Sequence, residues 1–230
     1  GEERLQIEIH GEPVWREESS LVLLLQLLSH RSVLDLKGAE ESLARARELE
    51  PTDPRVAFLY ARVVDTQGFH DQAIDIMQES ARDNPTDAST FDNLGIFLRS
   101  QNRTEEAITA FKRACELDPA DSNPWYNLAN TYIDAEKFDK AEEAMRKHMK
   151  LEPSHSCPHY ELGLILAERG RSQEAIELFK QYAELEPTDP KGPCSIGIEF
   201  TRTGNHVESE KMYREALQID PGYDWANHSL

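Results

Sequence analysis

His155, Cys157 and His159 are the residues whose types and close spacing could bind a metal ion. Imidazole nitrogen and thiolate sulfur are usual zinc ligands, and a structural zinc site holds four of them. Pro158 interrupts the segment, so the three side chains would not converge, and no second pair supplies a fourth ligand. The sequence therefore predicts no metal site. We expect instead a histidine in a turn, a small cysteine on a groove and a histidine that packs on a helix.

Motifs of the common enzyme classes are absent from the sequence. It has no glycine-rich phosphate loop, no HExxH motif and no nucleophile that follows a strand. Its 43 acidic residues are spread along the chain, and carboxylates form a general acid–base pair only within a pocket. We therefore expect a protein that is not an enzyme and that uses no cofactor.

Amide and aromatic side chains recur at a fixed spacing that suits recognition of another chain. Asn93 and Asn127 are 34 residues apart, and so are Tyr126 and Tyr160. An amide offers a donor and an acceptor together, so it can pair with a peptide backbone of any sequence. An aromatic ring offers a large contact area at little cost in conformational entropy. These residue types indicate binding rather than catalysis.

The same spacing organises the elements that must position these side chains. Six prolines follow it: Pro51, Pro85, Pro119, Pro153, Pro187 and Pro221. A fixed period in this range indicates a repeat array. Within each copy, apolar residues recur three and four apart, which predicts helices. We number the positions of each copy from its first residue, and the copies begin at Ser20, Pro54, Ala88, Ser122, Ser156 and Pro190.

Small and large residues alternate in a way that predicts two closely crossing helices, A and B, in each copy. Position 8, in helix A, is small in five copies, and position 20, in helix B, is alanine in most of them. Position 24 is large, with Phe111, Met145, Phe179 and Tyr213 in the last four copies. Asp53-Pro54 and Asp189-Pro190 predict helix starts, because Asp caps a helix and Pro suits its first turn. Gly68, Gly170, Gly204 and Asn102 mark the turn between the helices, where a left-handed residue is common.

The third copy carries the clearest pattern, with Phe91, Leu94, Gly95, Leu98, Ala107, Phe111, Ala114 and Pro119. On these residues, the chain resembles the tetratricopeptide repeat (TPR) family over residues 20–230. The resemblance implies an all-α, right-handed superhelical solenoid of about six TPR helix-turn-helix repeats. We expect an extended N-terminal arm over residues 1–19, with the start of a truncated seventh repeat over 224–230. The six repeats between them would be 20–53, which is degenerate, then 54–87, 88–121, 122–155, 156–189 and 190–223.

In that family the A helices line a concave face, and positions 2, 5, 6, 9, 12 and 13 point into it. The resemblance therefore implies a peptide-binding face here. Its candidate residues are Arg55, Phe58, Arg62, Asn93, Arg99, Tyr126, Asn127, Asn130, Tyr160 and Glu161. Asn at position 6 is similar to the row of asparagines that holds an extended polypeptide in O-linked N-acetylglucosamine transferase. A second interpretation stays open, in which the same amides and rings pack within the array.

Net charge and composition restrict the possible partners. The net charge of −18 argues against nucleic acids and anionic membranes, which require a positive surface. The acidic residues either attract basic partners or simply solvate the surface. No apolar run is long enough to span a membrane, and we expect the apolar residues 21–28 to form helix A of the degenerate first repeat. Three cysteines, Cys115, Cys157 and Cys194, suggest a reducing compartment, so we expect a cytoplasmic protein.

The function expected from the sequence is a non-catalytic scaffold that binds a protein or an extended peptide along the concave face. Two alternatives remain open. The chain is the substrate-recruiting arm of a larger enzyme, such as a glycosyl- or sulfo-transferase, or it self-associates through an uncapped C-terminal end. A clamp for C-terminal carboxylates is not expected, because Phe58 and Asp92 occupy positions where that class of TPR domain carries lysine.

Overall fold

The computed structural model describes residues 5–9, 12–16 and 36–229 and divides them into two compact units. Unit 1 is Gly1–Pro119 and unit 2 is Ala120–Leu230. The apolar stretch 21–28, expected to form the first helix A, lies outside the described residues. None of the helices within the described ranges combines the length and the apolar character that crossing a bilayer requires.

The N-terminal segment forms an antiparallel pair of strands, β1 (Leu5–Ile9) and β2 (Glu12–Arg16), with Ile7 opposite Val14. The extended conformation expected for this arm is interrupted after Ile9 and resumes at Glu12. Pro13 lies inside β2, opposite Glu8. Proline is tolerated there because in a two-stranded sheet each strand is an edge, and an edge residue can do without its N–H.

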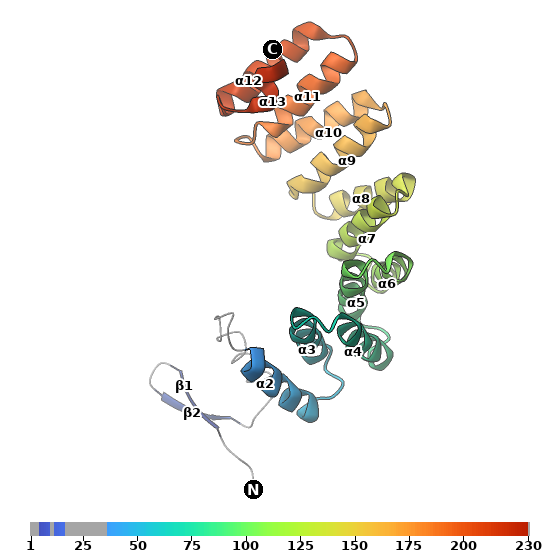
Figure 1. Ribbon diagram of the computed structural model, residues 1–230, viewed down its shortest axis with the longest axis vertical. Coiled ribbons are helices and arrows are strands. Elements are labelled where there is room, and N and C mark those ends of the chain that lie inside the picture. The colour runs from blue at the N-terminus through green and yellow to red at the C-terminus, as the bar shows by residue number, and fades with distance from the viewer. Residues whose placement is uncertain (1–4, 10–11, 17–35, 230) are drawn as a thin grey trace. The chain divides into compact units, whose positions relative to one another are not determined.

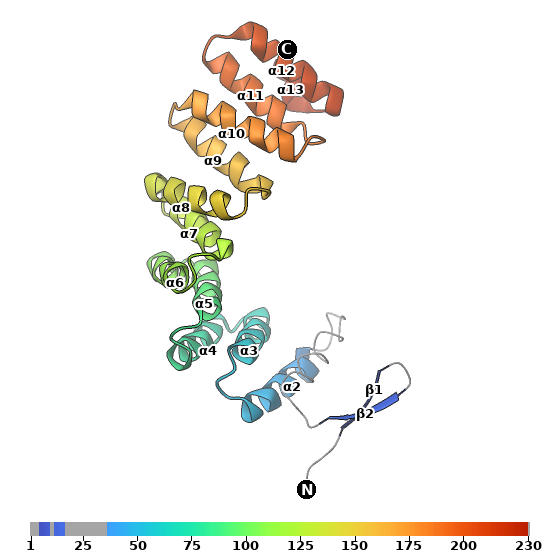
Figure 2. The same cartoon turned by 180° about the vertical axis from the view of Figure 1, so that it is seen from behind.

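Helical hairpins account for the rest of the described chain, which confirms the all-α repeat architecture (Figure 1). In unit 1 the helices are α2 (Leu36–Leu49), α3 (Pro54–Thr66), α4 (His70–Asp83), α5 (Ala88–Ser100) and α6 (Thr104–Leu117). In unit 2 they are α7 (Ser122–Asp134), α8 (Phe138–Leu151), α9 (Ser156–Glu168), α10 (Ser172–Leu185), α11 (Lys191–Arg202), α12 (His206–Ile219) and α13 (Asp224–Ser229). Within each unit, the second helix of a hairpin packs on the first helix of the next. Seen from behind in Figure 2, α9, α10, α11 and α12 lie side by side in this order.

Local signals in the sequence account for the helix ends. Asp53, Asp87 and Asp121 each accept a backbone N–H bond at the start of α3, α5 and α7. Asp189 accepts the backbone N–H of Lys191 at 2.9 Å, although α11 begins at Lys191 and Pro190 precedes the helix. The turns between paired helices contain residues with positive φ: Gly68, Asn102, Glu136, Gly170 and Gly204. Glu136, at φ 56°, was not expected in this role.

The helix crossings follow a pairing rule between positions 8 and 24. A Cβ added to Gly95 would lie 2.5 Å from the ring of Phe111, and one added to Gly163 would lie 2.5 Å from Phe179. Gly197 faces Tyr213 in the same way, at 2.8 Å. Where position 8 is alanine, as in Ala61 and Ala129, position 24 is methionine, Met77 and Met145. A rigid ring therefore requires glycine, whereas a flexible methionine leaves room for one methyl group.

Candidate functional site

In unit 1, the candidate residues on α3 and α5 are partly engaged with their neighbours. The Arg55 guanidinium lies 2.6 Å from the Asp53 carboxylate, and this contact holds the pKa of Asp53 below its usual range. The half-buried Phe58 ring contacts Phe97 of α5 edge-to-face, with centroids 6.3 Å apart. The exposed Arg62 guanidinium lies over the Phe58 ring, 5.6 Å from its centroid. Phe58 therefore contacts a neighbouring A helix and also an exposed cation.

The other two unit 1 candidates, Asn93 and Arg99, lie on α5 and are half-buried. Asn127, at the position equivalent to Asn93, belongs to unit 2 and is also half-buried. The expected row of amides therefore stays a prediction.

In unit 2, the position-5 tyrosines bridge consecutive A helices. The Tyr126 hydroxyl on α7 donates to Glu161 Oε1 on α9 at 3.0 Å, and the Asn130 side chain also hydrogen-bonds that hydroxyl. The Tyr160 hydroxyl on α9 accepts a 3.5 Å bond from Ser195 Oγ on α11. Burial, together with the Glu161 carboxylate, raises the pKa of Tyr126. The same contact, from position 5 to position 6 of the next repeat, thus occurs twice.

The rings of these tyrosines also pack on the B helices. The centroid of the Tyr160 ring lies 4.9 Å from that of Tyr182 and 5.6 Å from that of Phe179, both on α10. The Tyr126 ring lies 5.1 Å from His148 and 5.2 Å from His155. Each tyrosine is half-buried, so it stabilises the array and keeps one edge on the surface.

A cluster of three histidines, His148, His155 and His159, lies next to Tyr126. His148 Nδ1 is 2.8 Å from the Ser122 carbonyl oxygen, which can only accept, so this nitrogen carries a proton. Its Nε2 then accepts from His155 Nδ1 at 2.8 Å. His159 is buried and donates from Nδ1 to the His155 carbonyl at 3.0 Å. Burial and the neighbouring His155 and His148 lower the pKa of His159.

The cluster fits a packing role for the histidines that were considered as metal ligands. His155 and His159 make the hydrogen bonds above, while Cys157 is exposed. Across the part of the chain that the structure describes, no three His, Cys, Asp or Glu side chains are grouped so that they could hold a metal ion. His148 was not singled out from the sequence. The signal was its position 27, where the other five copies carry Ala46, Ser80, Ala114, Tyr182 and Ala216.

Exposed apolar side chains recur at position 9 of the A helices. Ile96 on α5 is 44% exposed, Leu164 on α9 is 42% exposed and Ile198 on α11 is 40% exposed. Arg62 and Asn130 occupy position 9 in α3 and α7. The sequence placed these apolar residues on the expected face but did not select them as contacts.

Two residues of the same expected face are buried instead. Cys194 is 2% exposed because it packs against Tyr213, Ala216 and Ala226 of α12 and α13. This burial raises the pKa of the Cys194 thiol to about 11. Ser195, beside it, is 7% exposed. The first turn of α11 therefore offers no thiol to a ligand.

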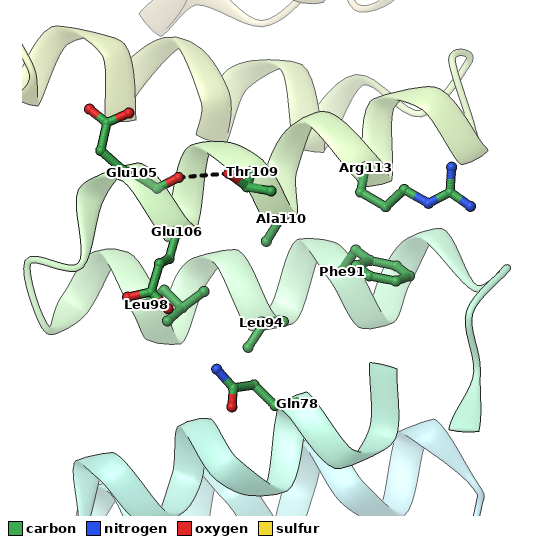
Figure 3. Close-up of a pocket in the computed structure, with 9 residues that line it drawn as sticks. All are labelled: Gln78, Phe91, Leu94, Leu98, Glu105, Glu106, Thr109, Ala110 and Arg113. Carbon is green, nitrogen blue, oxygen red and sulfur yellow. Dashed lines mark hydrogen bonds between the residues drawn. The ribbon is translucent and has the colours of Figure 1, made fainter. Parts of the chain in front are cut away.

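A groove that sequence reasoning missed lies in unit 1, where α5 and α6 meet the edge of α4 (Figure 3). Its volume is about 560 Å³. The apolar lining consists of Phe91, Leu94, Leu98 and Ala110, and the polar lining consists of Gln78, Glu105, Glu106, Thr109 and Arg113. Arg113 lies over the Phe91 ring, 5.9 Å from its centroid. The groove depends on the packing of three helices, which the sequence pattern does not specify.

Comparison with protein families gives the chain a classification. The model of the ChAPs family, described as Chs5p-Arf1p-binding proteins, matches residues 31–149, just over half of the chain. The chain belongs to the ChAPs family. A tetratricopeptide repeat model also matches this ChAPs protein, over residues 126–190, so the helical hairpins are TPR repeats. No curated protein matches the chain.

Solved structures with similar folds are TPR proteins of low sequence identity. The structure of PilF from Pseudomonas aeruginosa has a TM-score of 0.71 and 18% identity over 92% of this chain and 96% of that chain. YrrB, described as a TPR protein with an unusual peptide-binding site, has a TM-score of 0.69 and 18% identity over 83% and 98%. A MamA protein has a TM-score of 0.67 and 21% identity over 73% and 92%. At these identities the likeness establishes the fold alone.

Proposed function

We propose that this protein is a non-catalytic scaffold that binds an extended segment of a partner protein along the A helices. The observation that carries the proposal is the pair Leu164 and Ile198, which are exposed at the same position of consecutive A helices. A single exposed apolar residue is ordinary in a soluble protein, but apolar residues repeated in register create a continuous surface that favours a partner.

The surroundings of this pair suit a peptide. Tyr160 lies on the same helix as Leu164 and is half-buried, so it supplies a hydroxyl group next to this surface. Successive side chains of an extended peptide point to opposite sides. Alternate side chains can therefore contact the apolar residues while the backbone meets this hydroxyl group.

Family membership supports a protein as the partner. The ChAPs family is named for binding Chs5p and Arf1p, and YrrB is described as having a peptide-binding site. The expected contacts at Arg55, Phe58, Arg62, Asn93 and Arg99 in unit 1, and at Tyr126, Asn127, Asn130, Tyr160 and Glu161 in unit 2, remain part of the proposal.

The proposal is tested with a random peptide library displayed on phage. Peptides selected on the wild-type chain are synthesised with a fluorescent label, and their affinities are measured by anisotropy. Burial of two partly exposed aliphatic side chains contributes roughly 1 kcal/mol each, at about 25 cal/mol per Å². The variant Leu164→Ser/Ile198→Ser is therefore expected to bind about 10- to 30-fold more weakly.

The matched control is Val207→Ser. Val207 is 78% exposed on α12, so its replacement removes a comparable apolar surface at a place outside the A helices. The control should keep wild-type affinity. Equal loss in both variants, or no loss in either, would contradict the proposed face.

A further inference from the structure

The unit 1 groove is lined by side chains that are not candidates for the proposed peptide face, although α5 carries residues of both. Its floor is made by Phe91, Leu94 and Leu98, which are three and four residues apart and therefore lie along one side of α5. Ala110 of α6 stands opposite and presents only a methyl group to the groove. The floor spans two turns, or about 10 Å, at 1.5 Å per residue.

The fourth repeat carries bulkier side chains at two positions that line the groove in the third repeat. At the positions of Phe91 and Leu98, the fourth repeat carries the larger Trp125 and Tyr132. Lys147 lies over the Trp125 ring at 5.7 Å and Lys140 lies over the Tyr132 ring at 5.9 Å. The TPR fold thus accepts bulky rings at these two positions, and the third repeat has smaller side chains there.

Charge gives the groove two different ends. Glu105 and Glu106 lie in the first turn of α6, and Arg113 lies eight residues further, about 12 Å along the helix. Near the acidic end, Arg103 bonds to Glu106 at 2.7 Å and also interacts with Asp71 and Asp75 of α4. Three carboxylates therefore interact with one guanidinium, and Glu105 adds a further negative charge at this end, so this end attracts positive charge. In the fourth repeat, lysine (Lys140) replaces Glu106.

We propose that this groove is a second docking site, which takes an amphipathic helix from a partner protein. The groove follows α5 and α6, and a ridge of side chains from a third helix fits between two packed helices. The partner helix would place apolar residues, spaced three and four apart, on Phe91, Leu94 and Leu98. A basic residue at one end of it would lie beside Glu105 and Glu106, and an acidic residue would lie towards Arg113.

The probe for this site is a labelled, alanine-rich peptide of about 15 residues, the length at which such peptides become helical in water. It carries three leucines spaced three and four apart, arginines at one end and glutamates at the other. A second peptide has the two charged ends exchanged, relative to the same leucines. Fluorescence anisotropy with the whole chain should show that one peptide of the pair binds at least tenfold more tightly than the other.

Two substitutions taken from the fourth repeat test the assignment. Leu98→Tyr fills the floor as Tyr132 does, and we expect it to weaken binding of the preferred peptide at least tenfold. Glu106→Lys adds the charge that Lys140 carries in the fourth repeat, and we expect it to reduce or reverse the preference between the two peptides. Glu106 is half-exposed, so this variant remains informative if Leu98→Tyr fails to fold. Circular dichroism of both variants verifies the fold.

The matched control is Leu164→Tyr, the same change on the proposed peptide face, and it should leave the helical peptide bound as in the wild type. Failure of the extended-peptide experiment would not affect this result, because Leu164 and Ile198 lie on α9 and α11, whereas the groove is lined by residues of α4, α5 and α6. The docking site is refuted if neither helical peptide binds the wild-type chain, or if Leu98→Tyr and Glu106→Lys bind both peptides as the wild type does.

Discussion

The pairing of glycine with an aromatic ring at the helix crossings predicts the outcome of a small substitution, Gly163→Ala. The added methyl carbon would lie 2.5 Å from Phe179 Cε1 and 2.8 Å from Cδ1. Carbon atoms in contact normally stand about 3.5–4.0 Å apart, so the ring would have to move by about 1 Å. Phe179 is 1% exposed and packs against Tyr160, so little space is available for that movement.

Two opposing contributions determine how much Gly163→Ala changes the free energy of unfolding. Overpacking a buried site costs about 1–3 kcal/mol. Alanine is better than glycine inside a helix by about 1 kcal/mol. The free energy of unfolding should therefore fall by roughly 1 kcal/mol, even though the change improves the helix propensity.

A double-mutant cycle separates the two contributions. Met77 and Met145 accompany alanine in the second and fourth repeats, so Phe179→Met should make room for the methyl group of Gly163→Ala. We expect Phe179→Met alone to be less stable because it leaves space beside Gly163. The double variant should be more stable than the sum of the single changes predicts, by about 1–2 kcal/mol.

The assay is unfolding in urea, monitored by the circular dichroism of the helices at about 220 nm. Repeat arrays do not always unfold in two states, so the unfolding of all four proteins must be shown to have the same slope before free energies are compared. A coupling energy below about 0.3–0.5 kcal/mol would mean that the glycine and the ring do not constrain each other, and the pairing rule would be wrong.

Three further predictions rest on single residues. Glu136→Gly should raise stability by about 0.5–1 kcal/mol, because Glu136 has a φ of 56° that a glycine adopts without strain; lower stability in thermal melts would contradict this. Asp53→Ala should lower stability by about 1 kcal/mol through loss of the α3 cap, whereas Arg55→Ala, which leaves the cap in place, should lower it less. The pKa of His159 is lowered in the folded state, mainly by burial. Stability should therefore fall as the pH drops below about 6.5, where the unfolded chain gains a proton more readily than the folded chain does. The variant His159→Phe, which has the residue found at this position in the third repeat, should show a smaller loss over the same pH range in urea titrations.

Much of the helical framework could be predicted because it depends on local signals. The proline period, the capping aspartates and the turn glycines act within a few residues of their own position, so the sequence displays them directly. Glu136 was missed because glutamate rarely adopts a positive φ, and here the structure of the hairpin imposes that conformation.

The surfaces were harder to predict because they depend on contacts between repeats. Position 5 was expected to face a ligand in every A helix, but α12 and α13 cover Cys194. The tyrosines at the same position turned out to share their surface with neighbouring helices. The groove of unit 1 is lined by residues from α4, α5 and α6, so the residue pattern of any one helix does not predict it.

The tyrosine bridges between A helices limit how this protein can acquire new ligands during evolution. If the tyrosines bind a partner as proposed, a mutation at Tyr126 or Tyr160 would alter recognition and would also remove a hydrogen bond between two repeats. Leu164 and Ile198 have much of their surface in solvent, so they can change with little structural penalty. New specificities should therefore arise first at position 9, while the tyrosines are retained because they connect adjacent A helices.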